Sequence, residues 1–172
     1  MRYKSFTPLA LAVCAVCAVS FSSGEARADL FAGGYARATK CVKNCGHGSM
    51  FSIGGEVGWG LFAFGLRYGY KDSTSFLFPD LRVLYDLKLP LSFIVTPLVE
   101  FSPVATFSSA GKGVDLYLRP GVRVAWAPLK VLAVFLEPIV WDIGFWHKAP
   151  GGATSSTVTQ GYNFGFGAQF RL

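Results

Sequence analysis

The last twelve residues of the chain, GYNFGFGAQFRL (residues 161–172), alternate between two kinds of side chain. One set of alternate positions holds Tyr162, Phe164, Phe166, Ala168, Phe170 and Leu172. The other set holds Asn163, Gly165, Gly167, Gln169 and Arg171. Successive side chains of a β-strand point to opposite faces, so the stretch predicts a strand with one aromatic face and one small, polar face. A soluble protein would bury the aromatic face, whereas a membrane barrel would turn it outward.

The first 28 residues predict a secretory signal peptide. Arg2 and Lys4 precede the apolar run LALAVCAVCAVSF, and Ala26-Arg27-Ala28 follows it. A basic start, a short apolar run and small residues at the cleavage site have this order in signal peptides. We therefore expect residues 1–28 to be cleaved and residues 29–172 to form one domain. A retained membrane anchor and a lipoprotein modified at Cys14 or Cys17 are the alternatives.

The composition is unusual for a secreted soluble domain. Charged residues make up 15% of the chain and hydrophobic residues 52%, whereas about a quarter of an ordinary soluble domain is charged. Beyond the signal peptide, no segment approaches the ~20 continuous apolar residues of a membrane helix. The apolar residues are therefore expected in strands. The formal net charge is +6, but the basic residues are mostly scattered singly, so no nucleic-acid partner is expected.

Eight segments alternate or are rich in β-forming residues: 30–38, 49–58, 61–71, 76–87, 91–101, 114–126, 131–142 and 159–172. The gaps 39–48, 102–113 and 143–158 are long, and the gaps 59–60, 72–75, 88–90 and 127–130 are short. Long and short connections at opposite ends are typical of an up-and-down barrel across a membrane. The gap 72–75 belongs to the long-loop end and is nevertheless short.

The bulk of the two faces predicts which of them points outward. The interior of an eight-stranded barrel is only just wide enough to be filled by side chains, and the aromatic face would overfill it. We therefore predict an all-β, eight-stranded antiparallel up-and-down transmembrane β-barrel with its aromatic face in lipid. Prolines inside the predicted strands oppose this, because each removes a ladder donor. Pro79, Pro97, Pro120 and Pro138 are expected to mark bulges or strand portions beyond the membrane.

In this architecture the chain resembles the small eight-stranded outer-membrane barrels of the OmpA/OmpX type. The resemblance covers residues 29–172 and rests on architecture, not on a shared motif. The terminal QFRL (169–172) is similar to the family's C-terminal assembly signal, which usually ends in Phe; Leu172 departs from that pattern. The resemblance implies a place in the outer membrane of a Gram-negative-type envelope, contact with outer-membrane lipid and recognition by the barrel assembly machinery.

Charged residues on the small, polar face form the first candidate site. They are Glu56, Arg67, Arg82, Glu100, Asp115, Arg119, Arg123, Glu137 and Arg171, with Asp80 alongside. Both signs occur in one narrow lumen, and buried ions are tolerated when they are paired and hydrogen-bonded. The interpretation is a plugged polar core, with an ion pathway as the alternative.

Two cysteines and a histidine form the second candidate site. Cys41 and Cys45 lie in the first long gap, and His47 follows them. An oxidising envelope favours a disulfide between Cys41 and Cys45. A metal bound by the three residues and free thiols are the alternatives, and three ligands at this spacing match no strong zinc pattern. No metal and no cofactor is therefore expected.

These observations favour a non-enzymatic outer-membrane protein with a structural or surface-interaction role through its extracellular loops. The sequence names no loop partner. The alternatives are a narrow pore or small-ligand carrier, a lipid-modifying outer-membrane enzyme and a soluble lipocalin-like barrel. Beyond the signal peptide the chain contains only two histidines, His47 and His147. Lipid A deacylases place a Ser two residues after their His, where this chain has Ala149, so no catalytic residue is assigned.

Overall fold

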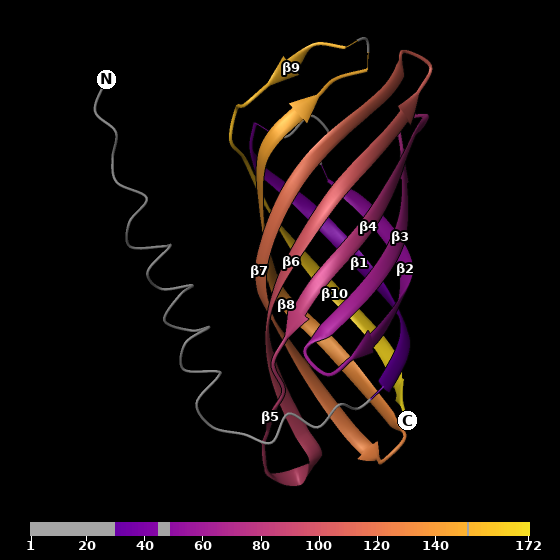
Figure 1. Ribbon diagram of the computed structural model, residues 1–172, viewed down its shortest axis with the longest axis vertical. Helices are drawn as coiled ribbons and strands as arrows, with labels where there is room; N and C mark the ends of the chain where they lie inside the picture. The colour runs from indigo at the N-terminus through magenta and orange to yellow at the C-terminus, as the bar shows by residue number, and fades with distance from the viewer. Residues whose placement is uncertain (1–29, 45–48, 151) are drawn as a thin grey trace, which may run out of the picture.

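The computed structural model describes residues 30–44, 49–150 and 152–172, which form one closed antiparallel barrel (Figure 1). Its eight long strands are β1 (Leu30–Lys43), β2 (Met50–Trp59), β3 (Phe62–Lys71), β4 (Thr74–Leu84), β6 (Phe93–Ser108), β7 (Gly111–Leu129), β8 (Leu132–Lys148) and β10 (Thr159–Arg171). Each pairs with its neighbours in the chain, and β10 pairs with both β8 and β1, which closes the ring. The prediction of an all-β, eight-stranded up-and-down barrel is confirmed. The predicted signal peptide lies outside the described residues.

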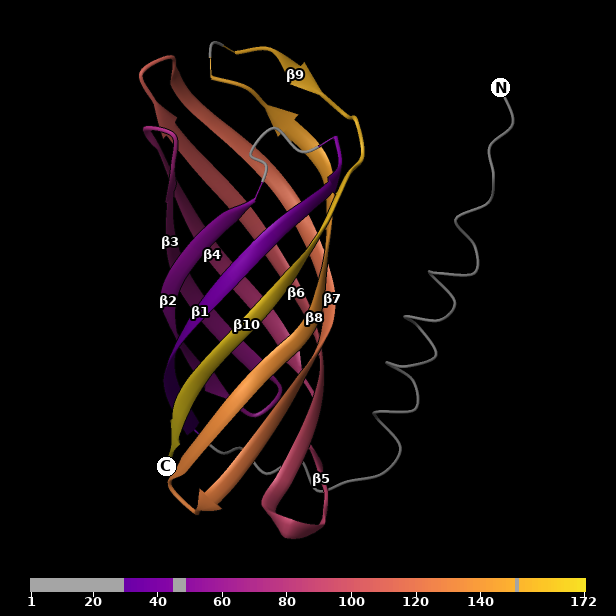
Figure 2. The same ribbon diagram turned by 180° about the vertical axis from the view of Figure 1, so that it is seen from behind.

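The two ends of the barrel differ in their connections (Figures 1 and 2). At the end where the chain finishes, here called the turn end, lie the connections 60–61, 85–92 and 130–131. The connection 85–92 contains β5 (Leu87–Lys88) and the 3-10 turn η1 (Pro90–Ser92). At the other end, the loop end, lie 44–49, 72–73, 109–110 and 149–158, the last of which contains β9 (Thr154–Ser155).

The predicted long loop 102–113 is wrong. Strands β6 and β7 pair without a break from Phe93↔Trp126 to Ser108↔Gly111, which leaves only residues 109–110 as a turn. The Ser-, Pro- and Gly-rich composition of 102–113 suggested a loop, but cross-strand pairing and burial decide strand formation more strongly than local composition. At the turn end, β5 pairs with β6 at Leu87↔Val95 and Lys88↔Ile94, so that the turn itself is residues 89–92, close to the predicted 88–90.

One of the four prolines marks a bulge. Around Pro138, β8 shifts register by one residue against both β7 and β10. Glu137 and Val140 are both buried, whereas Pro138 and Ile139 between them are both exposed. The bulge therefore reverses which alternate residues of β8 point inward on its loop-end side.

The other three prolines mark no bulge, because none of them lies at a register shift. The β4–β6 pairs pass from Leu77↔Ala105 to Leu81↔Phe101 without a shift. Between these two pairs β4 and β6 are not paired, and Pro79 and Pro103 lie midway along that stretch. Pro97 and Pro120 each face a valine across the β6–β7 pair. A barrel wall thus accepts proline where the lost donor interrupts one ladder locally.

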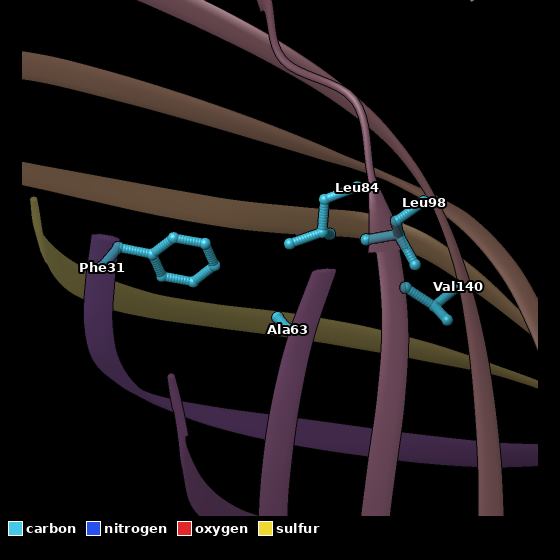
Figure 3. Close-up of a cluster of buried hydrophobic side chains, with 5 residues drawn as sticks. All are labelled: Phe31, Ala63, Leu84, Leu98 and Val140. Carbon is cyan, nitrogen blue, oxygen red and sulfur yellow. The ribbon is translucent and has the colours of Figure 1, made fainter. Parts of the chain in front are cut away.

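The outer surface of the barrel is apolar and the lumen is filled. In the terminal strand, Phe164, Phe166 and Phe170 are 46%, 54% and 61% exposed, whereas Asn163 and Gln169 are buried. Inside, apolar side chains pack toward both ends of the lumen. Figure 3 shows one cluster, formed by Phe31, Ala63, Leu84, Leu98 and Val140 from five strands. Within the described part of the chain, no helix is long and apolar enough to cross a membrane.

Candidate functional site: the lumen and its loop-end cavity

The middle of the lumen is built around the carboxylate of Glu100. Arg37 Nη1 donates to both of its oxygens, at 2.8 and 3.0 Å. Arg82 Nε donates to Oε2 at 2.9 Å, and Arg119 Nη1 and Arg67 Nη2 donate to Oε1 at 2.9 and 3.1 Å. The four guanidinium groups come from β1, β3, β4 and β7, so one carboxylate on β6 connects four other strands across the lumen.

Arg123 holds two further carboxylates on the turn-end side of Glu100. Its Nη1 and Nη2 donate to the two oxygens of Glu56 at 2.6 and 2.9 Å, and its Nη2 also donates to Glu137 at 2.8 Å. Gln169 accepts a further bond from Nη1 at 3.1 Å. The guanidinium carbon lies 3.9 Å from the ring centroid of Phe135, close enough for a cation–π contact.

Asp80 collects donors from three other strands. Arg67 reaches it with Nε at 2.6 Å and Nη2 at 3.0 Å, a bidentate pair. The hydroxyl of Tyr35 donates at 2.9 Å and that of Ser102 at 2.7 Å. Every strong acceptor site of this buried carboxylate is thus matched by a donor.

Asp142 completes the network on the loop-end side of Glu100. It accepts hydrogen bonds from Arg119 Nε and, at 2.7 Å, from Asn163 Nδ2. The network then pairs five arginines with five carboxylates: Arg37, Arg67, Arg82, Arg119 and Arg123 with Glu56, Asp80, Glu100, Glu137 and Asp142. We call these ten residues the waist. The ten charges are equal in number and opposite in sign, so the waist has no net charge; Arg37 Nη2 is a buried nitrogen without a hydrogen-bond partner among the described residues.

The side chains of the waist leave little free space in the lumen. The void beside Arg119 and Asp142 measures only about 20 Å³, which is room for roughly one water molecule. Above it, at the loop end, a cavity of about 630 Å³ opens outward. Thr159 and Tyr117 line both the small void and this loop-end cavity, so they form the partition between them.

The structure places seven of the nine predicted lumen charges in the waist and two elsewhere. Asp115 lies at the loop end, where its Oδ1 is 3.2 Å from His147 Nδ1. Arg171 lies at the turn-end rim, where its Nη2 donates to Asp86 at 3.0 Å. Both pairs are partly open to solvent. These two charges do not join the waist, because position along a strand, and not only facing, decides whether a charge reaches it.

Two waist residues were missed by the reading of the sequence. Arg37 was missed because β1 reverses the size pattern: Phe31 and Tyr35 are buried, while Ala32 and Ala36 face outward. The charge of Arg37 within an alternating strand was the sequence feature that could have indicated its inward position. Asp142 was missed because the Pro138 bulge moves it from the outer to the inner face, and Pro138 itself was the only sequence sign of that shift.

His147 is engaged through both ring nitrogens. Nδ1 faces Asp115, and Nε2 lies 3.0 Å from the carbonyl oxygen of Thr157. A histidine acting as general base for a serine needs one nitrogen on the hydroxyl, and here the second nitrogen contacts a backbone carbonyl. His147 of β8 thus contacts both Asp115 of β7 and the backbone at Thr157.

The cysteine site is only partly described. Cys41 lies near the end of β1, whereas Cys45 and His47 lie outside the described residues. The predicted disulfide therefore stays a prediction. Among residues 30–44, 49–150 and 152–172, no group of three or more His, Cys, Asp and Glu residues could hold a metal ion.

No protein-family model matches the chain, and no curated protein sequence matches it. Two solved structures are similar: Neisserial surface protein A (NspA), and the N-terminal β-barrel domain of Pseudomonas aeruginosa OprF. Each is 13% identical, with 83% of this chain covered, a TM-score of 0.50, and 96% of NspA or 97% of the OprF domain covered. The chain has the fold of the small eight-stranded outer-membrane β-barrels. At 13% identity the likeness concerns the fold alone.

Proposed function

We propose that residues 29–172, after removal of the signal peptide, form a closed, non-conducting barrel in the outer membrane. The role proposed is structural, with a surface interaction at the loop end, and non-enzymatic. The waist carries this proposal, because a lumen filled by matched charges leaves no continuous water path. Three long loops were predicted from the sequence, but the connections 72–73 and 109–110 are short. The proposed interaction surface is therefore the 149–158 connection together with the loop-end rim.

The proposed place in lipid is supported by the outer surface. Phenylalanine, leucine and isoleucine side chains stand exposed around the barrel, and Trp59 and Trp126 stand exposed at the turn end. An apolar band edged by aromatic residues is typical of membrane barrels. The barrel assembly machinery is the proposed partner in insertion, through the terminal strand β10.

Conductance in planar bilayers tests the closed barrel. Refolded wild-type protein should give no reproducible current steps. The double variant Glu56→Ala with Arg123→Ala removes one negative and one positive charge from the waist. If it folds, it should give current steps, and heat-modifiable gel migration checks the folding. The pair Asp86→Ala with Arg171→Ala at the rim is the matched control and should stay silent. Uniform current steps from the wild type would refute the plug and favour the narrow pore.

Solubility tests the membrane location. Without detergent or lipid the mature chain should aggregate, and in detergent it should migrate faster on gels before heating than after. A monomer in plain buffer would contradict the proposal.

The predicted Cys41–Cys45 bridge would close a short loop and stabilise it locally by about 2 kcal/mol. Unreduced mature protein should then weigh two hydrogens less than the reduced form. Ready reaction of the folded protein with a maleimide would argue against the bridge.

A further inference from the structure

The loop-end cavity is a cup with a floor. Its volume of about 630 Å³ falls within the roughly 300–1,000 Å³ of small-molecule sites. Tyr117 and Thr159 form the floor, and Arg119 with Asp142 closes the lumen beneath them. A ligand that enters from the loop end would therefore be held there and would not pass through.

The lining of the cup is rich in hydroxyl groups and balanced in charge. Hydroxyl side chains come from four strands and include those of Thr74, Thr106, Ser108, Thr154, Ser155 and Thr159. Its charged side chains are Lys71, Lys148, Asp72 and Asp115, so that two positive charges match two negative ones when His147 is neutral. Serine and threonine hydroxyls donate and accept hydrogen bonds equally well. Such a lining suits an uncharged ligand that itself carries many hydroxyl groups.

Two of these hydroxyls are buried and lack a hydrogen-bond partner. Thr106 and Thr159 are 5% and 4% exposed, and the Oγ1 atom of each has no hydrogen-bond partner among the described residues. A buried polar atom without a partner is disfavoured by about 1–3 kcal/mol, so a ligand that supplies the missing bond gains from it. The aromatic rings of Phe76 and Tyr117 lie deep in the same lining, where they offer apolar contact to the C–H groups of a ring.

We propose that the loop-end cavity binds a saccharide of one or two sugar rings. Hydroxyl groups around the wall, matched charges and aromatic rings at the base are the chemistry that such a ligand needs. The proposal rests on the proposed function, because the closed waist supplies the floor of the cup.

Solution NMR of the refolded, isotope-labelled protein tests the proposal. The detergent must be zwitterionic and free of sugar headgroups, because a glycoside detergent would occupy the cup. Glucose, galactose, N-acetylglucosamine and lactose serve as probes. At least one of them should shift the resonances of Thr106, Tyr117 and Ser155 in a saturable manner, while Leu84 and Ile94 near the turn end stay unchanged. No saturable shift with any probe, or shifts mainly at the turn end, would overturn the proposal.

A matched pair of variants on β6 sharpens the test. Thr106→Val keeps the shape and removes the hydroxyl, so binding should weaken roughly two- to tenfold, as expected for one hydrogen bond. Thr96→Val removes a buried hydroxyl near the turn end, where it donates to Asp86, and should leave the affinity unchanged. Equal losses in both variants would contradict the cup. Ser155→Trp, on the exposed strand β9, should fill the cup and abolish binding even if Thr106→Val fails to fold.

The sugar has two possible sources, which the lipid environment separates. In nanodiscs that contain lipopolysaccharide, a neighbouring lipid's sugars would shift the cup resonances before any probe is added. In phospholipid nanodiscs, only free saccharide would shift them. Conductance separates the two proposals: a silent protein that binds no probe overturns the cup alone, and a conducting protein that binds a probe overturns the plug alone.

Discussion

Glu100 and Phe101 follow each other in β6 and meet opposite surroundings. Glu100 is fully buried and contacts four arginines, whereas Phe101 is 40% exposed on the outer surface. Their side chains point to opposite faces of the barrel wall, as successive side chains of a strand do. Charged side chains on the inner face are stabilised by specific hydrogen-bond partners. Apolar side chains on the outer face depend instead on the medium that surrounds the barrel.

This difference sets different rules for the two faces. A buried ion pair contributes little net stability compared with apolar packing, but the loss of one partner leaves an unpaired charge and is strongly destabilising. On the outer face, one apolar side chain can replace another at little cost, whereas a charge is excluded from lipid. On the inner face, stability should thus fall most when one charged partner is removed. On the outer face, it should fall most when a polar or charged side chain is introduced.

The largest effect is expected at the centre of the inner face. Glu100→Ala would leave four guanidinium groups without their shared acceptor and should destabilise the barrel by about 3–5 kcal/mol. Urea unfolding in lipid vesicles measures this. Phe101→Leu, the adjacent outward residue, is the control and should cost less than about 1.5 kcal/mol. Equal effects would mean that water already screens the waist.

A charge on the outer face should come next. Phe166 is 54% exposed on β10, and Phe166→Arg places a cation near the bilayer midplane at a cost of roughly 2–4 kcal/mol. The same unfolding assay applies, with Phe166→Leu as the apolar control. A neutral Phe166→Arg variant would show that this face does not meet lipid.

An inward residue at the margin of the waist should matter less. Gln169 accepts one hydrogen bond from Arg123, while Glu56 and Glu137 also hold that guanidinium. Gln169→Ala should therefore cost about 1 kcal/mol, the value of one such bond. If Gln169→Ala is severe and Phe166→Arg is mild, the two faces of β10 are assigned backwards.

The smallest effect is expected at the rim. Arg171 pairs with Asp86 where both side chains remain partly accessible to water. Solvent-exposed ion pairs contribute between 0 and about 1 kcal/mol, so Arg171→Ala should be nearly neutral in the unfolding assay and should lose its small effect at high salt. A loss comparable to that of Glu100→Ala would place Arg171 in the waist after all.

The alternation of small polar and bulky apolar residues was enough to predict eight strands, a closed barrel and an apolar outer surface. This succeeds because the two-residue period of a strand is local, and every strand repeats the same choice between two faces. It failed in β1, where tyrosine and phenylalanine fill space inside the lumen and alanine lies outside. The prediction compared the total side-chain volume of the two faces over all eight strands. A single strand can place large side chains inside the lumen where its neighbours place small ones.

The charges that meet in the waist, the continuous β6–β7 hairpin and the loop-end cavity were decided only by the tertiary structure. Arg37 bonds to Glu137 and Glu100, which lie 100 and 63 positions away. Such partners are brought together by the closure of β1 on β10 and by the stagger of the strands, neither of which leaves a local pattern. The Pro138 bulge likewise selects Asp142 for the inner face by adding one residue to β8. The sequence by itself thus determined which face each ordinary strand turns inward, and ring closure decided which inward residues meet.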